Sequence, residues 1–206
     1  MSQFKAFGSM VIAGCTGAGK TRWTLRLLKN LGHMYDVPPR RVLYCYGIWQ
    51  DLYEDIQRLP SVDMIEGLPS KEMLEGMENT LVILDDLVHR VIGDPEMELL
   101  FTQKCHHQKL SVIMLTQNVF QQGKHARTIT LNTWYLVLFE NARDRQQVAT
   151  LGRQLFPGKH KGFMEAYDDA TSEPYGYLVI DTAPQSRYRL RTHVFPGEDP
   201  VVYALR

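Results

Sequence analysis

The chain lacks three features that mark large classes of protein: a surplus of charge of one sign, a long apolar run and a set of paired cysteines. Lys plus Arg and Asp plus Glu number 23 each, so no strong basic field of the kind typical of nucleic-acid binders is expected. No apolar run approaches the roughly 18 residues that a membrane span requires, and the first ten residues contain no apolar core of a secretory signal. We therefore expect a protein that is not secreted and has no membrane partner.

The cysteines indicate neither a disulfide framework nor a zinc knuckle. Cys15, Cys45 and Cys105 are odd in number, widely separated and without a paired spacing, so we expect three reduced thiols. The run from Cys105 to His107 offers metal-binding side chains, but no second pair of ligands follows at the spacing of a zinc site. We prefer to interpret His106 and His107 as caps of a helix end.

The composition is that of an ordinary globular protein, with 44% apolar and 22% charged residues. A chain of 206 residues is long enough for one sizeable core, and it contains no repeat, low-complexity tract or linker. We therefore expect residues 1–206 to form a single domain.

Strands and helices alternate along the predicted fold. A helix is predicted from Thr21 to Leu31, with Gly32 as a left-handed stop. Others are predicted from Asp94 through Phe101 and from Asp144 to Leu155, and short helices broken at Pro60 and Pro69 are expected between Trp49 and Met77. This alternation predicts an α/β three-layer sandwich around a mostly parallel sheet. Apolar or β-branched runs predict strands at residues 9–13, 41–46, 80–84, 110–115, 134–139 and 177–180.

One motif carries specific chemistry. Residues 14–21 match the pattern GxxxxGK[ST] between an apolar strand and an amphipathic helix, which is the context that this phosphate-binding pattern requires. Its glycines let backbone N–H groups surround phosphate oxygens, Lys20 bridges the outer phosphates, and Thr21 offers its hydroxyl to Mg²⁺. This predicts a site for ATP with Mg²⁺. The residues of the predicted cradle are Gly14, Cys15, Thr16, Gly17, Ala18, Gly19, Lys20 and Thr21.

Polar residues at two strand ends add candidates. Asp85 closes an apolar strand, the position at which such enzymes hold Mg²⁺ through a carboxylate. Asp86 either activates the attacking water or is a helix N-cap or a solvated acid in a turn. Gln117 either hydrogen-bonds the γ-phosphate and the lytic water or is a buried amide satisfied by the backbone. Arg127 and Arg143 are candidate arginine fingers, although either alone is a common surface arginine.

A row of arginines near the C-terminus offers a further surface. Arg187, Arg189 and Arg191 share one face of a predicted strand by period two. The row either contacts a phosphate backbone or protects an exposed edge strand by its charge.

Taken together, these motifs resemble the FtsK-HerA superfamily, and within it the genome-packaging ATPases of poxviruses, adenovirus-like elements, virophages and Polinton or adintovirus elements. The resemblance covers almost the whole chain. The segments that carry it are AGCTGAGKT (13–21), LVILDD (81–86), HHQKLSVIMLTQN (106–118), residues 127–132, residues 141–144 and PYGYL (174–178).

This resemblance implies an additional-strand P-loop core, in which the strand ending at Gln117 lies between the strands ending at Gly14 and Asp85. It implies a homo-oligomeric ring of five or six subunits that docks on a viral capsid vertex and translocates double-stranded DNA while hydrolysing ATP. Such a protein is intracellular, in nucleus or cytoplasm, or virion-associated. Arg127, with Arg143 second, becomes the arginine acting on the neighbouring subunit. At Asp86 many members carry a glutamate, so its role as base is less firmly implied than that of Asp85.

Two functions of other classes are compatible with a phosphate-binding loop. A small-molecule kinase would need an acceptor pocket and an arginine-rich lid, for which residues 123–127 are poorly suited. A nucleotide-dependent switch or assembly protein would bind ATP with little turnover. The adjacent acids Asp85 and Asp86 favour hydrolysis.

Overall fold

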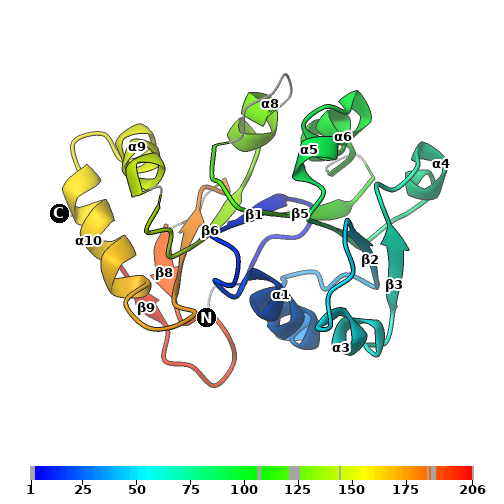
Figure 1. Cartoon of the computed structure of the whole chain (residues 1–206), viewed down its shortest axis with the longest axis horizontal. Coiled ribbons are helices and arrows are strands. Elements are labelled where there is room, and N and C mark those ends of the chain that lie inside the picture. Colours follow the sequence, from blue (N-terminus) through cyan, green and yellow to red (C-terminus); the bar gives the residue numbers. More distant parts are fainter. Residues whose placement is uncertain are drawn as a thin grey trace.

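The backbone alternates strands and helices around a central sheet (Figure 1). The computed structural model describes residues 3–105, 108–120, 126–143, 145–184, 186 and 189–205, and for Lys104, Ala126 and Arg127 it describes the backbone alone. The strands predicted from apolar or β-branched runs are present with ends within one residue of expectation, whereas the strand predicted through residues 187–191 begins only at Leu190. The strands are β1 (Ser9–Ala13), β2 (Arg41–Tyr46), β3 (Val62–Glu66), β4 (Thr80–Asp85), β5 (Leu110–Thr116), β6 (Tyr135–Phe139), β7 (Tyr177–Asp181), β8 (Leu190–Thr192) and β9 (Val201–Val202).

The helices are short. Among those described, α9 and α10 have 11 residues each, and none is both long and apolar enough to cross a membrane. At the start of α6 the Asp94 side chain accepts from the Glu96 N–H (2.8 Å), the N-cap that the sequence predicted. The helices are α1 (Lys20–Lys29), α2 (Leu31–Met34), α3 (Tyr53–Gln57), α4 (Lys71–Leu74), α5 (Val88–Val91), α6 (Pro95–Leu99) with its π-helical continuation η1 (Leu100–Lys104), α8 (Ala126–Leu131), α9 (Arg145–Leu155) and α10 (His160–Ala170).

The sheet is parallel on one side and antiparallel on the other. Within the described residues its order is β3-β2-β4-β5-β1-β6-β7-β8-β9, and the strands from β3 to β6 pair in parallel. The last three strands are antiparallel additions. Strand β5 lies between β4 and β1, which confirms the predicted additional-strand arrangement.

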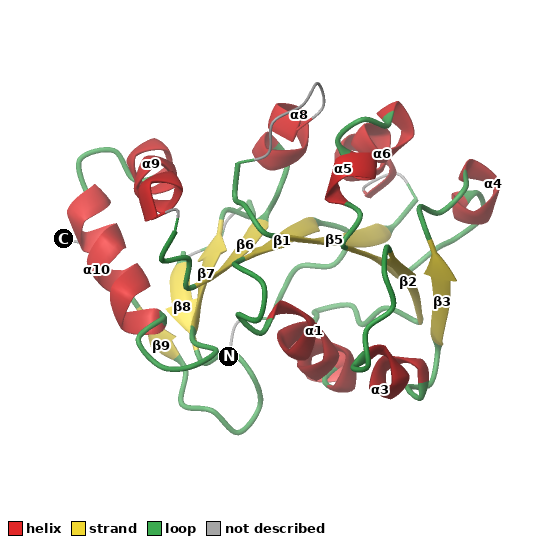
Figure 2. Ribbon diagram, in the orientation of Figure 1, coloured by secondary structure: helices red, strands yellow, loops and turns green. Residues whose placement is uncertain are grey.

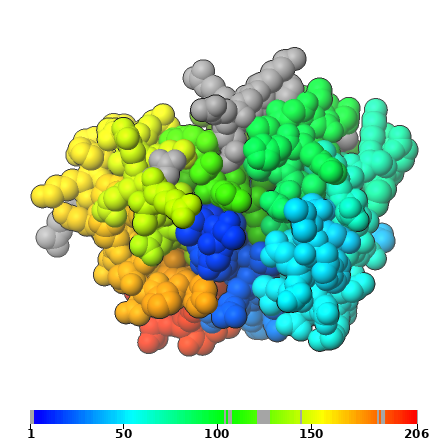
Figure 3. All heavy atoms as spheres, in the orientation of Figure 1, coloured from blue at the N-terminus to red at the C-terminus, as the bar shows by residue number. Residues whose placement is uncertain are grey.

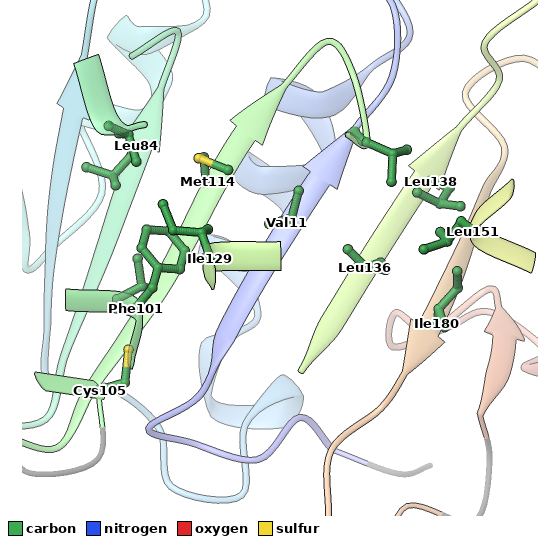
Figure 4. Close-up of a cluster of buried hydrophobic side chains, with 14 of the residues drawn as sticks. Val11, Leu84, Phe101, Cys105, Met114, Ile129, Leu136, Leu138, Leu151 and Ile180 are labelled. Atoms are coloured by element: carbon green, nitrogen blue, oxygen red, sulfur yellow. The ribbon is translucent and has the colours of Figure 1, made fainter. Parts of the chain in front are cut away.

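Helices cover both faces of the sheet, so the molecule has three layers (Figure 2). Successive residues of β1 point to opposite faces, because side chains alternate along a strand. Val11 and Ala13 belong to the core under α5, α6, α8 and α9, which Figure 4 shows in close-up, whereas Met10 and Ile12 belong to the core facing α1 and α3. Every residue of β1 is buried. Because β1 lies between β5 and β6 in the middle of the sheet, the loop that follows it lies near the centre of the side at which the parallel strands end.

Two element predictions were wrong. Residues 62–66 form β3 rather than part of a helix, because Met64 and Ile65 pair with β2 along the edge of the sheet and are only partly buried. Gly32 does not stop the first helix: α1 ends at Lys29 with Asn30 as its C-cap, and Gly32 lies inside the short helix α2.

Candidate functional site

The phosphate-binding loop connects β1 to α1, and its glycines occupy positions that favour glycine. Gly14 is buried: a Cβ atom there would lie 2.6 Å from Phe139 Cβ, and the Gly14 N–H donates to the Thr116 carbonyl (3.2 Å). Gly17 and Gly19 have φ angles of 82° and 104°, in the left-handed region that L side chains rarely adopt. The sequence therefore permits the tight strand-to-helix turn that a phosphate cradle needs.

Lys20 lies over the loop at the start of α1. Its Nζ donates to the carbonyls of Gly14 (2.7 Å) and Cys15 (3.0 Å). Burial lowers the pKa of Lys20, although the nearby Asp85 acts to raise it. Among the described residues no side chain caps the helix, and its first turn contains no acid. Because the first N–H groups of a helix lack intrahelical partners, this end of α1 and the Lys20 ammonium together favour an anion.

Asp85 closes β4 as a buried carboxylate surrounded by hydroxyl groups. Its Oδ2 accepts from the hydroxyls of Tyr44 (2.7 Å), Tyr53 (2.9 Å) and Thr21 (3.3 Å), and the residue is 4% exposed. Burial raises the pKa of Asp85, and the three hydrogen bonds act in the opposite direction. The contact with Thr21 joins the end of β4 to the phosphate-binding loop.

Asp86 and Gln117 are exposed at the ends of β4 and β5. Asp86 has a φ of 57°, which is uncommon for a residue other than glycine. Helix α5 has Leu87 as its N-cap, without a side-chain cap, so Asp86 does not cap it. Gln117 is not a buried amide, and that alternative interpretation was wrong. Both side chains are accessible to a ligand.

A cleft of about 530 Å³ brings most of the predicted site residues together. Its volume is within the range of roughly 300–1,000 Å³ typical of small-molecule sites. Of the described site residues, Gly14, Cys15, Ala18 and Arg143 do not line it. The predicted residues that line it are Thr16, Gly17, Gly19, Lys20, Thr21, Asp85, Asp86 and Gln117. Lining residues to which the sequence assigned no role in the site are Arg22, Gln50, Leu52, Val88, His89, Leu115, Thr116, Asn118 and Tyr175.

The fold and this loop have counterparts among solved structures. The chain is similar to the genome packaging NTPase B204 from Sulfolobus turreted icosahedral virus 2, in complex with sulfate, with a TM-score of 0.58, 14% identity, and coverage of 93% of this chain and 98% of that chain. The same NTPase in complex with ATP-gammaS gives a TM-score of 0.57 at 14% identity, covering 91% and 97% of the two chains. Its complex with AMPPCP gives 0.55 at 14% identity, covering 94% and 98%.

The fold is that of a P-loop NTPase. At 14% identity the similarity concerns the fold. The similar structures are of a genome packaging NTPase, the class of protein that the sequence motifs resemble. No family model and no curated protein matches the sequence.

The P-loop and the end of β4 supply a donor set that suits magnesium. Mg²⁺ prefers oxygen ligands and is commonly held by one or two protein oxygens together with phosphates and water. The Thr21 hydroxyl and the Asp85 carboxylate are oxygen donors 3.3 Å apart beside the cradle for the phosphates. These two residues therefore fit a magnesium ion that arrives with a nucleotide.

Neither candidate arginine finger is placed in the cleft by the described residues. Arg143 is exposed just before α9 and does not line the cleft of its own chain. Arg127 lies in α8, where the structure describes its backbone alone. Three further interpretations stay predictions, because they fall on residues outside the described ones. They concern the lid (residues 123–125), the metal ligands His106 and His107, and Asp144 of the 141–144 segment. Cys105 is buried, and burial raises its pKa to about 12.

The prediction of a DNA-facing arginine row was wrong for Arg191. This residue is 4% exposed and pairs with the buried Asp181 (3.1 Å). Arg189 is exposed, and Arg187 lies outside the described residues. Arg189 precedes β8, so the alternation of a strand does not extend along the row. The alternative of a charged edge strand was also wrong for Arg191, because β8 lies between β7 and β9 and Arg191 is buried.

Sequence reasoning missed two hydroxyls that hold Asp85. Tyr44 lies on β2 opposite Ile83, two residues before Asp85 on the same face, and Tyr53 comes from α3. Both are fully buried and their rings meet edge to face, with centroids 5.4 Å apart. Tyr44 looked like an ordinary strand residue, because its partner becomes visible only when β2 and β4 are paired.

Proposed function

We propose that the chain is an ATPase that translocates double-stranded DNA into a viral capsid. The observation that carries this proposal is the cleft in which the P-loop, the buried Asp85, and the exposed Asp86 and Gln117 converge. The similarity of fold to a genome packaging NTPase supports it, as does the resemblance of the motifs to packaging ATPases. The reaction is ATP plus water to ADP plus phosphate.

The residues of the cleft have different roles in this reaction. The backbone N–H groups of the P-loop and the Lys20 ammonium hold the phosphates, for which Lys20 exchanges its bonds to the loop carbonyls for bonds to the triphosphate. Asp86 accepts a proton from the attacking water while Gln117 orients that water toward the γ-phosphate. Magnesium bound with the nucleotide would neutralise charge that develops on the phosphates.

A ring would complete the site. An arginine from a neighbouring subunit stabilises the charge of the transition state without belonging to the cleft of its own chain. Arg127 is the first candidate and Arg143 the second. Loss of the γ-phosphate then changes the contacts between subunits, and this change moves the loops that face DNA.

The test is hydrolysis of ATP with and without double-stranded DNA by wild type, Lys20→Ala, Arg127→Ala and Arg143→Ala. We expect DNA to stimulate the wild type, and both Lys20→Ala and Arg127→Ala to lose at least 100-fold in rate, in line with the 10³–10⁵ that an arginine finger contributes. Arg153→Ala is the matched control, because Arg153 is exposed on α9 and, among the described residues, its side chain donates to Thr150 alone, within the same helix.

Mixing the two inactive variants locates the arginine. An Arg127→Ala subunit keeps an intact P-loop and a Lys20→Ala subunit keeps an intact arginine, so mixed rings should regain part of the activity. Activity indifferent to DNA and intact in Arg127→Ala would contradict the motor. Phosphate transfer to a small acceptor would indicate a kinase, and partner binding with negligible turnover would indicate a switch.

A further inference from the structure

An exposed aromatic side chain stands at the rim of the cleft on a tight turn. Tyr175 lies between α10 and β7, and its residue is 55% exposed, which is high for a tyrosine. The Gly176 N–H donates to the Glu173 carbonyl (2.9 Å), and a Cβ atom on Gly176 would lie 2.6 Å from the Ala170 carbonyl oxygen. The turn is therefore closely packed at its base, and it presents Tyr175 at its tip.

The backbone of Tyr175 is strained. Its φ is 64°, in the left-handed region that is costly for a bulky side chain. Strain of this kind persists where the surrounding structure enforces it, and it gathers at ligand-binding sites. Asn or Gly would adopt this conformation at lower cost, so the position retains an aromatic ring at the expense of backbone energy.

The ring lies against the P-loop and the first turn of α1. A Cβ atom on Gly19 would come within 2.8 Å of Tyr175 Cδ1, so the last glycine of the loop gives the ring its room. The guanidinium carbon of Arg22 lies 5.1 Å from the ring centroid. Tyr175 and Arg22 line the same cleft as Lys20 and Asp85.

The sheet topology puts Tyr175 on the opposite side of the P-loop from the acids. Strands β5 and β4, which deliver Gln117 and Asp85, lie on one side of β1, and β6 and β7 lie on the other. Because β7 is antiparallel to β6, with Tyr177 opposite Phe139, it begins at the edge where β1 and β6 end. Tyr175, two residues earlier, therefore reaches the P-loop from this second side.

The surface agrees with this order. In Figure 3 the blue surface of the N-terminal part reaches the front of the molecule, with yellow-green and orange surfaces on one side of it and the cyan surface on the other. The orange surface belongs to the segment around the start of β7, and the cyan surface to the segment around α3.

A nucleoside triphosphate has charge at one end and an aromatic base at the other, which matches a cleft that has Lys20 in the P-loop, the acids on one side of this loop and an aromatic ring on the other. The acids and Thr21 fix the end at which the outer phosphates lie, so the base extends across the P-loop toward Arg22 and the turn before β7. We propose that Tyr175 is the stacking platform for the base of the bound nucleoside triphosphate. This inference rests on the proposed nucleotide binding and adds the subsite that receives the base. Because every base has an aromatic face, the platform should accept any of them.

The experiment compares two ligands that differ only in the nucleoside. Binding of ATP and of inorganic tripolyphosphate, each with Mg²⁺, is measured by titration calorimetry for wild type, Tyr175→Ala, Tyr175→Phe and Lys20→Ala. Tyr175→Ala should weaken ATP binding about tenfold, the usual loss for one stacked base, and leave tripolyphosphate binding unchanged. Tyr175→Phe keeps the ring and should bind both ligands as the wild type does. Lys20→Ala should weaken both.

The other outcomes overturn the inference in distinguishable ways. Equal weakening of both ligands by Tyr175→Ala would mean that Tyr175 merely supports the P-loop. Equal loss in Tyr175→Ala and Tyr175→Phe would assign the effect to the hydroxyl instead of the ring. Unchanged ATP binding in Tyr175→Ala, with binding lost in Lys20→Ala, would refute the platform and leave the proposed function intact. Wild type that binds neither ligand would remove the proposed function and this inference with it.

Discussion

Arg191 and Asp181 form an ion pair between β8 and β7, and their side chains are 5% and 6% exposed. The guanidinium carbon of Arg191 also lies 5.3 Å from the centroid of the Phe4 ring. Removing one member of such a buried pair leaves an uncompensated charge, which costs about 3–5 kcal/mol. We expect Arg191→Met to lower the free energy of unfolding by that amount in urea denaturation, and Arg191→Met with Asp181→Asn to recover most of the loss.

The loss in Arg191→Met should grow with pH. Burial raises the pKa of Asp181 above its ordinary value of 3.8, and Arg191 acts to lower it, so removal of Arg191 raises that pKa further. A carboxyl whose folded pKa exceeds its unfolded pKa contributes stability that is fully present below the unfolded pKa and is lost as pH rises through the folded pKa. The loss of unfolding free energy in Arg191→Met should therefore be smaller at a pH near the pKa of Asp181 in the unfolded chain than at neutral pH.

The matched control is Arg189→Met, two residues away on the exposed side of the chain. A surface substitution of this kind changes stability by no more than about 0.5 kcal/mol. Equal losses in the two variants, or a loss in Arg191→Met that does not depend on pH, would show that the buried pair is not the cause.

At the residue scale, sequence reasoning finds groups whose partners are local. Gly17, Gly19 and Lys20 belong to one short motif, so their roles follow from spacing alone. Tyr44 and Tyr53 contact Asp85 from 41 and 32 residues away, and no spacing rule connects them. Their contribution depends on strand pairing and on the packing of α3, which a single sequence does not specify.

At the scale of elements, α9 and α10 meet at a glycine. A Cβ atom on Gly152 of α9 would lie 2.3 Å from Phe163 Cδ1, and Phe163 is fully buried on α10. Alanine is favoured over glycine in a helix by about 1 kcal/mol, but forcing a methyl group into a packed core costs about 1–3 kcal/mol. The clash is with the ring of a fully buried side chain, so we expect Gly152→Ala to lower the melting temperature by several degrees.

Gly162→Ala on α10 is the control for this prediction. Its nearest atom would be Leu205 Cδ2 at 3.5 Å, an ordinary van der Waals contact. Helix propensity then acts alone, and this variant should be as stable as the wild type or slightly more stable. If Gly152→Ala matched Gly162→Ala in thermal denaturation, the two helices would not pack as described.

Elements that are buried on both faces could be predicted, and elements at edges could not. β1, β4 and β5 read as continuous apolar runs because helices cover both sides of them. β3 is an edge strand whose residues are only partly buried or exposed, so its sequence carries no such run. α10 has a buried stripe that includes Phe163, Ala166 and Tyr167, but no helix was predicted after residue 155.

At the scale of the whole molecule, the equal numbers of acidic and basic residues limit what one chain can do with DNA. Affinity for a duplex arises largely from contacts between cations and phosphates. A chain with 23 residues of each sign has no excess positive charge to supply many of them. A ring can sum a few contacts from each subunit, because binding of the second and later subunits to the same duplex is effectively intramolecular.

Affinity for DNA should therefore appear together with assembly. Anisotropy of a labelled duplex is measured over a protein dilution series, and sedimentation velocity under the same conditions gives the state of association. The logarithm of the binding constant should fall with the logarithm of salt concentration by about 0.9 for each phosphate contacted, so the slope should steepen when subunits associate. One subunit would bind DNA by itself if two results were found at concentrations where the chain is monomeric. These are an unchanged slope of the binding constant against salt and a binding curve that is a simple hyperbola. DNA would then be held by a local patch on each chain, and the ring would no longer be needed to explain binding.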